Sequence, residues 1–129
     1  MHPQPPPLAL IMTYVDGYVI PVPEANKDSY KALAERAAII FKDHGALSVV
    51  ECWSDDVPEG KLTSFPIAVQ RKPNEAIVFS WITWPSREVR DAGMDAAMKD
   101  PRMKFDDPTQ MPFDGKRMIF GGFRVLVNA

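Results

Sequence analysis

The segment near the end of the chain, residues 118–127, carries apolar side chains on both of its faces. Because side chains alternate across a strand, one face consists of Ile119, Gly121, Phe123, Val125 and Val127. The other face consists of Met118, Phe120, Gly122, Arg124 and Leu126. A strand with one face in water would alternate apolar with polar residues. We therefore expect helices to cover the first set and a second layer of protein to cover the other.

Three more segments are rich in β-branched and aromatic residues, which predicts strands. They are residues 14–22, 46–54 and 76–84. Between the first two, apolar residues at helical spacing predict a helix from Tyr30 to Phe41, which Gly45 ends. After the third strand, Ser86 is the expected N-cap of a second helix that runs through Met98. The order βαββαβ predicts an α+β, ferredoxin-like fold with an antiparallel sheet.

The remaining segments lie outside this pattern. Residues 1–12 form a proline-rich leader that favours an extended, disordered arm, so we expect residues 13–129 to form a single domain. Residues 62–75 are interpreted as an excursion from the sheet, because Pro66 would confine any strand there to an edge. The long loop at 100–115 is expected either to cover one end of the domain or to plug it with apolar side chains.

The other predicted strands also have a second face that mixes aromatic residues with a few polar ones, such as Tyr18 on the first and Trp53 on the second. Two helices cover only one face of a four-stranded sheet, so the aromatic face needs another cover. The same face of a second copy would supply it, and large apolar patches usually mark an interface or a ligand site. We therefore predict a homodimer whose two sheets pair as an α/β barrel.

The charge balance, the hydropathy and the single cysteine limit the classes of partner and the cellular location that we expect. The chain has 15 Lys and Arg against 17 Asp and Glu, and no basic run, so we predict no nucleic-acid partner. No apolar run approaches the roughly 20 residues of a membrane span, so we predict no membrane partner. The single cysteine, Cys52, cannot form an intramolecular disulfide, which favours the cytoplasm, and we interpret it as a small buried hydrophobic residue.

Four stretches of the chain together resemble one bacterial family. They are YVDGYVIPVP, GALSVVECWSDDVPEGK, VFSWITWPSREVRDAGMDAAMKDPRM and MPFDGKRMIFGGF. The family is the YbaA-like group of small uncharacterised proteins, a domain of unknown function, and the resemblance covers nearly everything from Met12 to Phe123. It implies the dimeric α/β-barrel superfamily, in agreement with the two covered faces of the sheet. It implies no catalytic residues, because the family has no established activity.

Three charged residues, Asp16, Glu51 and Arg124, are the candidate catalytic groups, since each is assigned to the aromatic face of a different strand. A guanidinium can hold one carboxylate while another keeps a raised pKa and acts as acid or base. The alternative is a network of ion pairs that fixes strand register and dimer geometry.

The candidate ligand-binding residues are aromatic, apart from one methionine. They are Tyr18, Trp53, Trp81, Phe120 and Met111. Flat aromatic side chains can stack on an aromatic ligand, and ordinary core or interface packing is the alternative. His44 has no His or Glu partner nearby in the sequence, so helix capping is its simpler role, and we predict neither a metal nor a cofactor.

Three functions remain open from the sequence. The first is a dimer that binds a small apolar or aromatic molecule in the barrel. The second is a cofactor-independent oxygenase or isomerase that acts on such a molecule between the two sheets, so whether the chain is an enzyme is undecided. The third is a structural dimer with a filled barrel. An open cavity lined by Asp16, Glu51, Trp53 and Arg124 would favour the first two.

Overall fold

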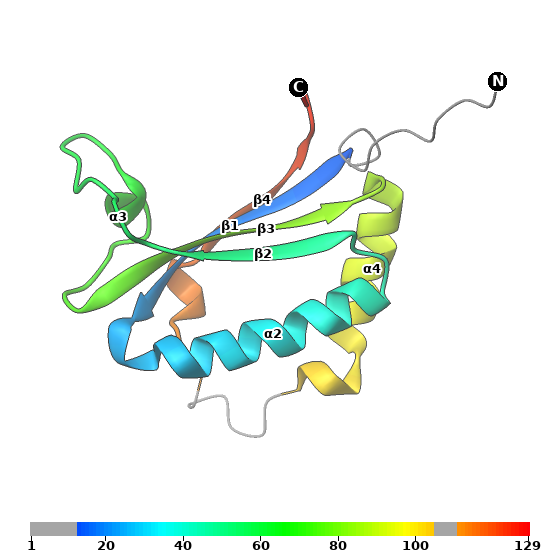
Figure 1. Cartoon of the computed structure of the whole chain (residues 1–129), viewed down its shortest axis with the longest axis horizontal. Coiled ribbons are helices and arrows are strands. Elements are labelled where there is room, and N and C mark those ends of the chain that lie inside the picture. The colour runs from blue at the N-terminus through cyan, green and yellow to red at the C-terminus, as the bar shows by residue number, and fades with distance from the viewer. Residues whose placement is uncertain (1–12, 105–110) are drawn as a thin grey trace.

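The computed structural model describes residues 13–104 and 111–129. Four strands form one antiparallel sheet in the order β2-β3-β1-β4, with two long helices packed against it (Figure 1). The strands are β1 (Tyr14–Pro23), β2 (Ser48–Trp53), β3 (Glu75–Trp84) and β4 (Ile119–Arg124). The helices are α2 (Lys27–Asp43), α3 (Phe65–Ala68) and α4 (Arg87–Lys99), with 3-10 turns at Glu24–Asn26, Pro101–Met103 and Gly115–Arg117. The predicted α+β class and antiparallel sheet are confirmed.

Local sequence signals explain where two of the helices begin. The Ser86 hydroxyl accepts a hydrogen bond of 3.1 Å from the backbone N–H of Val89, so the predicted N-cap of α4 is confirmed. In the ambiguous segment, the Ser64 hydroxyl caps α3 in the same way, at 3.1 Å from the N–H of Ile67. Pro66 fits at the start of that helix because the first helical positions need no N–H donor.

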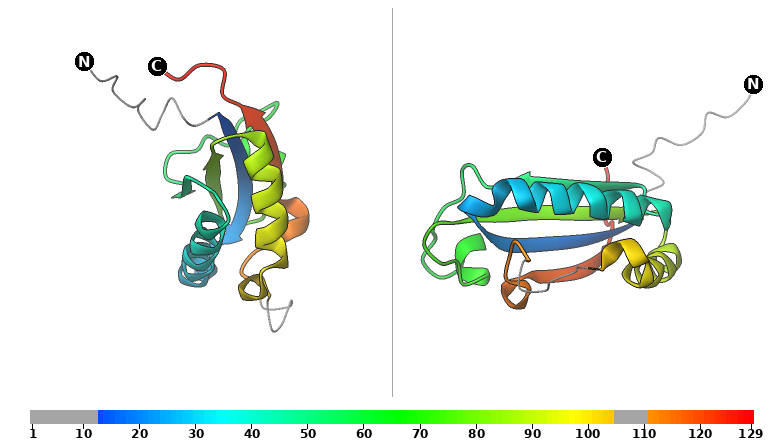
Figure 2. Two further views of the ribbon diagram at one scale, coloured as in Figure 1. Left: turned by 90° about the vertical axis from the view of Figure 1, so that its right-hand side faces the viewer. Right: turned by 90° about the horizontal axis from the view of Figure 1, so that it is seen from below.

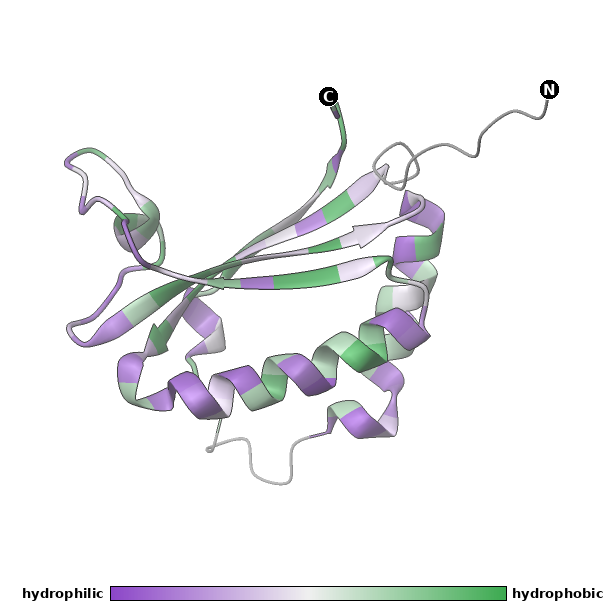
Figure 3. Ribbon diagram, in the orientation of Figure 1, coloured by the Kyte–Doolittle hydropathy of each residue, from purple (hydrophilic) through white to green (hydrophobic). Residues whose placement is uncertain are grey.

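Helices α2 and α4 cover the same face of the sheet, which we call the inner face. Figure 2 shows both helices in front of the strands in the view from below. Hydrophilic and hydrophobic residues alternate along α2 in Figure 3, as expected of a helix with one apolar side. Phe41 of α2 and Met94 of α4 pack on a core that includes Ile82 and the fully buried Trp84 of β3.

The predicted assignment of the two faces of β4 is wrong. A Cβ at Gly122 would lie 2.5 Å from Nη2 of Arg90 on α4, so Gly122 is on the helix-covered side. Phe120 and Arg124 share that face, whereas Phe123 lies on the opposite one. Alternation separates the two sets correctly but cannot tell which one meets the helices, because both sets are apolar.

The opposite face of the sheet, here called the outer face, is only partly covered. The register places on it Val15, Gly17, Val19, Pro21, Pro23, Ser48, Val50, Cys52, Glu75, Ile77, Phe79, Trp81, Thr83, Ile119, Gly121 and Phe123. Val69, just after α3, packs on Val19 and Ile77 at one end. Phe65 of α3 also packs against Phe79, with ring centroids 5.8 Å apart, yet Phe79 stays 46% exposed and Phe123 is 62% exposed.

The prediction that Cys52 is buried is also wrong. Its side chain is exposed on the edge strand β2, where it borders a surface hollow that Val57 and Phe65 also line. The proline-rich leader at 1–12 and the central part of the predicted loop, 105–110, lie outside the described residues. In the part of the chain that the structure describes, no helix is long and apolar enough to cross a membrane.

Candidate functional site

A cavity of about 430 Å³ lies between the inner face of the sheet and the helices α2 and α4. Most of its wall is apolar or aromatic, as in Leu33, Ala37, Met94 and Phe113. Six side chains bring polar atoms to it: Asp16, Tyr18, Tyr30, Glu51, Ser80 and Arg90. A mostly apolar chamber with a few convergent polar groups is the usual form of a small-molecule site. We call it the inner cavity.

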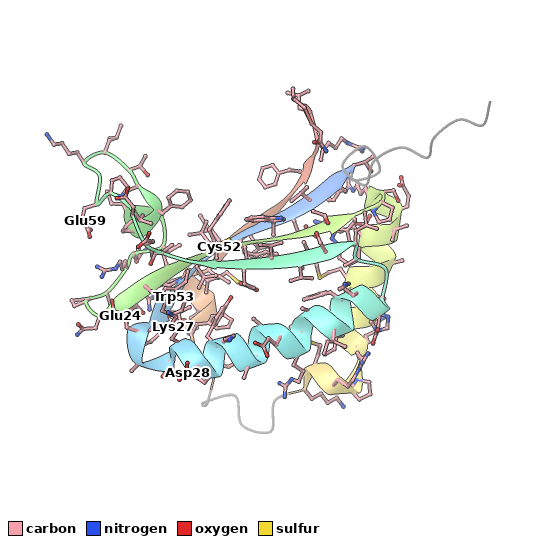
Figure 4. All side chains as sticks on the ribbon, viewed as in Figure 1. Glu24, Lys27, Asp28, Cys52, Trp53 and Glu59 are labelled. Carbon is pink, nitrogen blue, oxygen red and sulfur yellow. The ribbon has the colours of Figure 1, made fainter. Side chains whose placement is uncertain are left out.

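A second hollow, of about 480 Å³, opens between α2 and β2 and is called the mouth. Tyr30, Ala34 and Glu51 line both it and the inner cavity. On the solvent side, the Lys27 ammonium lies over the Trp53 ring, 5.3 Å from its centroid, and Figure 4 shows the two side chains together at the start of α2. Tyr30 and Glu51 thus stand where the mouth meets the inner cavity.

Strand register places a row of side chains across the floor of the inner cavity. Phe120 pairs with Tyr18, Tyr18 with Ser80, and Ser80 with Glu51, so one residue comes from each of the four strands. The Phe120 and Tyr18 rings stack with centroids 6.2 Å apart. The row therefore changes from aromatic at β4 to polar and acidic at β2.

The Glu51 carboxylate is positioned by hydroxyl groups. Tyr30 of α2 donates a hydrogen bond of 2.8 Å to Oε2 of Glu51, and the Ser80 hydroxyl is a second partner. Glu51 is exposed on its edge strand, but the side chains around its carboxylate partly desolvate it and raise its pKa, while the two hydroxyl hydrogen bonds lower the pKa in part. Burial, together with the negative charge of Glu51, raises the pKa of Tyr30, so Tyr30 remains a hydrogen-bond donor at neutral pH.

Asp16 on β1 has a different environment, although it lines the same cavity. It is 4% exposed and accepts hydrogen bonds from the Trp84 indole at 2.9 Å and from Arg90 Nε and Nη2 at 3.1 and 2.8 Å. The Arg90 guanidinium also lies 5.0 Å from the centroid of the Tyr14 ring and bonds Asp91 at 2.8 Å. These contacts hold Asp16 in place and fasten α4 to the sheet.

Comparison with known proteins places the chain in a family. The model of a family described as "Protein of unknown function (DUF1428)" matches residues 13–115. The chain belongs to the DUF1428 family. It is 55% identical over 117 residues to the uncharacterized protein YbaA of Escherichia coli strain K12 and to that of Shigella flexneri, covering 91% of this chain and 99% of those proteins. The matched region of this DUF1428 protein contains all six polar residues of the inner cavity.

Two of the three predicted catalytic residues come together in the DUF1428 structure. Asp16 and Glu51 both line the inner cavity. Arg124 is exposed and lines none of the hollows described for residues 13–104 and 111–129, and Arg90 pairs with Asp16 instead. Arg90, Met94 and Met98 recur at four-residue spacing on α4, which is the sequence signal that would have placed Arg90 on the inward side of that helix.

The predicted ligand-binding residues are dispersed. Tyr18 and Phe120 line the inner cavity, and Trp53 lines the mouth. Trp81 is on the outer face, where its ring centroid lies 5.6 Å from that of Phe79. Met111 lines a separate surface hollow near the ion pair of Glu75 with Arg117. Sequence reasoning missed Tyr30 and Ser80, which carry no charge and looked like ordinary helix and strand residues.

His44 follows α2 as its C-cap residue, in the predicted position. Its Nε2 lies 2.9 Å from Oδ2 of Asp100, which Arg102 also holds. Hydrogen bonds from Arg102, more than the one from His44, hold the pKa of the Asp100 carboxyl well below its usual range. Among the described residues, no group of three His, Cys, Asp or Glu side chains is arranged to hold a metal ion.

Proposed function

We propose that this DUF1428 protein binds a small apolar or aromatic molecule in the inner cavity. The observation that supports this most is the combination of a chamber of about 430 Å³ with a largely apolar wall and a few convergent polar groups. The sequence placed such a ligand between two paired sheets. The position of the cavity favours a site between the sheet and the helices, within one copy of the chain.

The polar groups favour a neutral ligand. The negative charge of Asp16 is offset by Arg90, which is itself shared with Asp91. Glu51 is the remaining carboxylate of the cavity, and an anionic ligand would meet its negative charge at close range. Tyr18 and Phe120 offer aromatic surface on which a flat ring can stack.

Binding of 5-nitroindazole, a small neutral aromatic compound, tests the proposal by calorimetry. Ala37 lines the inner cavity, so the larger side chain of Ala37→Leu would occupy space that the ligand needs and should weaken binding about tenfold, or about 1.4 kcal/mol. Ala32 is exposed on the same helix, so Ala32→Leu is the matched control and should bind like the wild type. Absence of saturable binding, or equal loss in both variants, would contradict the proposed site.

We also propose that two copies of the chain pair through the outer face, in the manner of a ferredoxin-like βαββαβ domain forming a dimeric α/β barrel. The partly covered aromatic patch around Phe79, Trp81 and Phe123 supports this, because such a patch is unusual on a free surface. A two-fold axis would bring the face against itself, and the charge of Glu75, which the register places at one end of this face, is paired with Arg117.

We also propose a cytoplasmic location. The thiol of Cys52 is free and exposed, and such thiols stay reduced in the cytosol.

A further inference from the structure

We propose that Glu51 is the proton acceptor of the inner cavity, and that its substrates are small neutral carbonyl compounds with a removable proton on carbon. The proposal rests on the proposed function, since the compound must first bind in the cavity. It adds a reaction, a catalytic residue and a substrate class to that function.

The two carboxylates of the cavity differ in how much of their acceptor capacity is occupied. Asp16 is almost fully buried and receives hydrogen bonds from Trp84 and from two nitrogens of Arg90. Glu51 is reachable from both the cavity and the mouth, and its partners are the hydroxyl groups of Tyr30 and Ser80. A carboxylate has about four lone-pair positions, so Glu51 keeps room to take a proton from a ligand.

The row of side chains across the floor of the inner cavity includes a second polar group, the Tyr18 phenol, that can contact the same ligand as Glu51. Tyr18 and Glu51 flank Ser80 on neighbouring strands, and two strand spacings place their backbones about 10 Å apart. Burial raises the pKa of Tyr18 to about 12, so its phenol stays protonated and donates a hydrogen bond. A small molecule lying over Ser80 can direct a C–H bond toward Glu51 and a carbonyl oxygen toward Tyr18.

The reaction is a proton shift. Glu51 takes a proton from the carbon next to the carbonyl, the electron pair of the broken C–H bond forms a C=C bond, and the carbonyl π pair moves to the oxygen that Tyr18 holds. The protonated Glu51 then returns the proton to a different carbon of a conjugated substrate, which gives an isomer. Atoms and electrons balance without an oxidant or a cofactor, and a carboxylate with raised pKa is the stronger base.

The charged and titratable groups around Glu51 come from every neighbouring element. Tyr30 is on α2, Tyr18 and Asp16 are on β1, and Arg90 is on α4. At the mouth, α2 adds charged side chains, namely Lys27, Asp28, Lys31 and Glu35. These last four sum to no net charge, so desolvation and the two hydroxyl groups govern the protonation of Glu51.

The base is tested with 5-nitrobenzisoxazole, an aromatic carbon acid of the same shape as 5-nitroindazole. A base removes its ring C3 proton, the C–H pair forms a nitrile, the N–O bond breaks and a yellow phenolate is released. Glu51→Gln should lower this rate about 100-fold, the scale of general-base catalysis. Asp95→Asn removes an exposed carboxylate on α4 that lines neither the inner cavity nor the mouth, and it should leave the rate unchanged.

The pH profile separates a catalytic role from a structural one. The rate should rise as Glu51 loses its proton, with a midpoint above the ordinary value of about 4.3. Tyr30→Phe removes a hydrogen bond that lowers the pKa of Glu51, so the midpoint should move to higher pH. A rate that is equal in wild type and Glu51→Gln, while both bind 5-nitroindazole, would overturn the catalytic role and leave binding intact. Failure of both proteins to bind would overturn both proposals.

The substrate class is tested with phenylacetone in D2O. Proton removal by Glu51 appears in NMR spectra as exchange of deuterium into the carbon positions beside the carbonyl. Wild type should accelerate this exchange, Glu51→Gln should abolish the acceleration, and Tyr18→Phe should reduce it about tenfold or more because the developing negative oxygen loses its donor. Elimination of 5-nitrobenzisoxazole without any exchange of phenylacetone would contradict carbonyl compounds as the class.

Discussion

The Tyr30 phenol donates a hydrogen bond of 2.8 Å to Glu51 and thereby joins the first turn of helix α2 to the edge strand β2. The two residues are 21 positions apart in the chain and meet where the mouth opens into the inner cavity. Tyr30, an uncharged helix residue, thus helps to orient the Glu51 carboxylate in the inner cavity.

The first prediction concerns pH and stability. Desolvation raises the pKa of Glu51 in the folded chain, so between its unfolded and folded pKa values the folded state binds more protons. Stability from this group is therefore greatest below the unfolded value and is lost as pH rises through the folded value. Urea unfolding from pH 4 to 8 should show the stability of wild type falling relative to Glu51→Gln as pH increases. A difference that grows in the opposite direction would contradict the raised pKa.

The second prediction concerns the ion pair under α4. Asp16→Asn keeps the size of the side chain but leaves the Arg90 guanidinium without its buried partner. Breaking a buried pair usually costs about 3–5 kcal/mol, and we expect about 2–3 kcal/mol here because the Arg90 side chain is 23% exposed. Chemical denaturation measures the loss. A loss below about 0.5 kcal/mol would show that Asp16 does not fasten α4 to the sheet.

The third prediction separates the adjacent glycines of β4. A Cβ at Gly122 would lie 2.4 Å from the Tyr14 hydroxyl, so Gly122→Val should reduce the free energy of unfolding by about 1–3 kcal/mol. At Gly121 the nearest atoms are those of the Phe123 ring, at 3.5 Å, so Gly121→Val should be better tolerated in the monomer and should change the outer face instead. Thermal melting of the two variants compares them directly. Greater loss of stability in Gly121→Val would mean that the two faces are exchanged.

The fourth prediction concerns the proposed homodimer. Phe123→Asp places a charge in the exposed aromatic patch of the outer face, on the edge strand β4, and should convert a dimer to a monomer at micromolar concentration, as measured by light scattering. Ile39 is 61% exposed on α2, so Ile39→Asp is a control of similar chemistry away from that face. A wild-type protein that is monomeric at these concentrations would contradict the pairing.

The strands and long helices were predictable because their signals are local. Alternation of β-branched residues marks β1 and β3, and Ser86 supplies an N-cap that the structure confirms. The side of the sheet that meets the helices was not predictable, because aromatic residues occupy both sides. Asp16 and Glu51 looked unsuited to a helix-covered core, yet Arg90 and Tyr30 from the helices satisfy them there.

The residues that pair with the candidate catalytic residues were harder to predict than the candidate residues themselves. Asp16 and Glu51 stood out as charges within apolar strands, and both reached the cavity. The prediction that Arg124 supplies the guanidinium of the site is wrong. Arg90 of α4 supplies it, 74 positions from Asp16 along the chain. The spacing on α4 places Arg90 on the inward side of the helix, but its contact with Asp16 depends on how that helix packs across the sheet.

The central claim is that small aromatic molecules bind in the inner cavity, and methyl NMR of the methionines tests it most directly. Met94, Met98 and Met118 line the cavity, whereas Met103 and Met111 do not. Titration of 13C-methyl-labelled protein with 5-nitroindazole should shift the signals of the first three and leave the other two unchanged. Saturable binding with no change in Met94, Met98 and Met118 would place the ligand elsewhere and contradict the account.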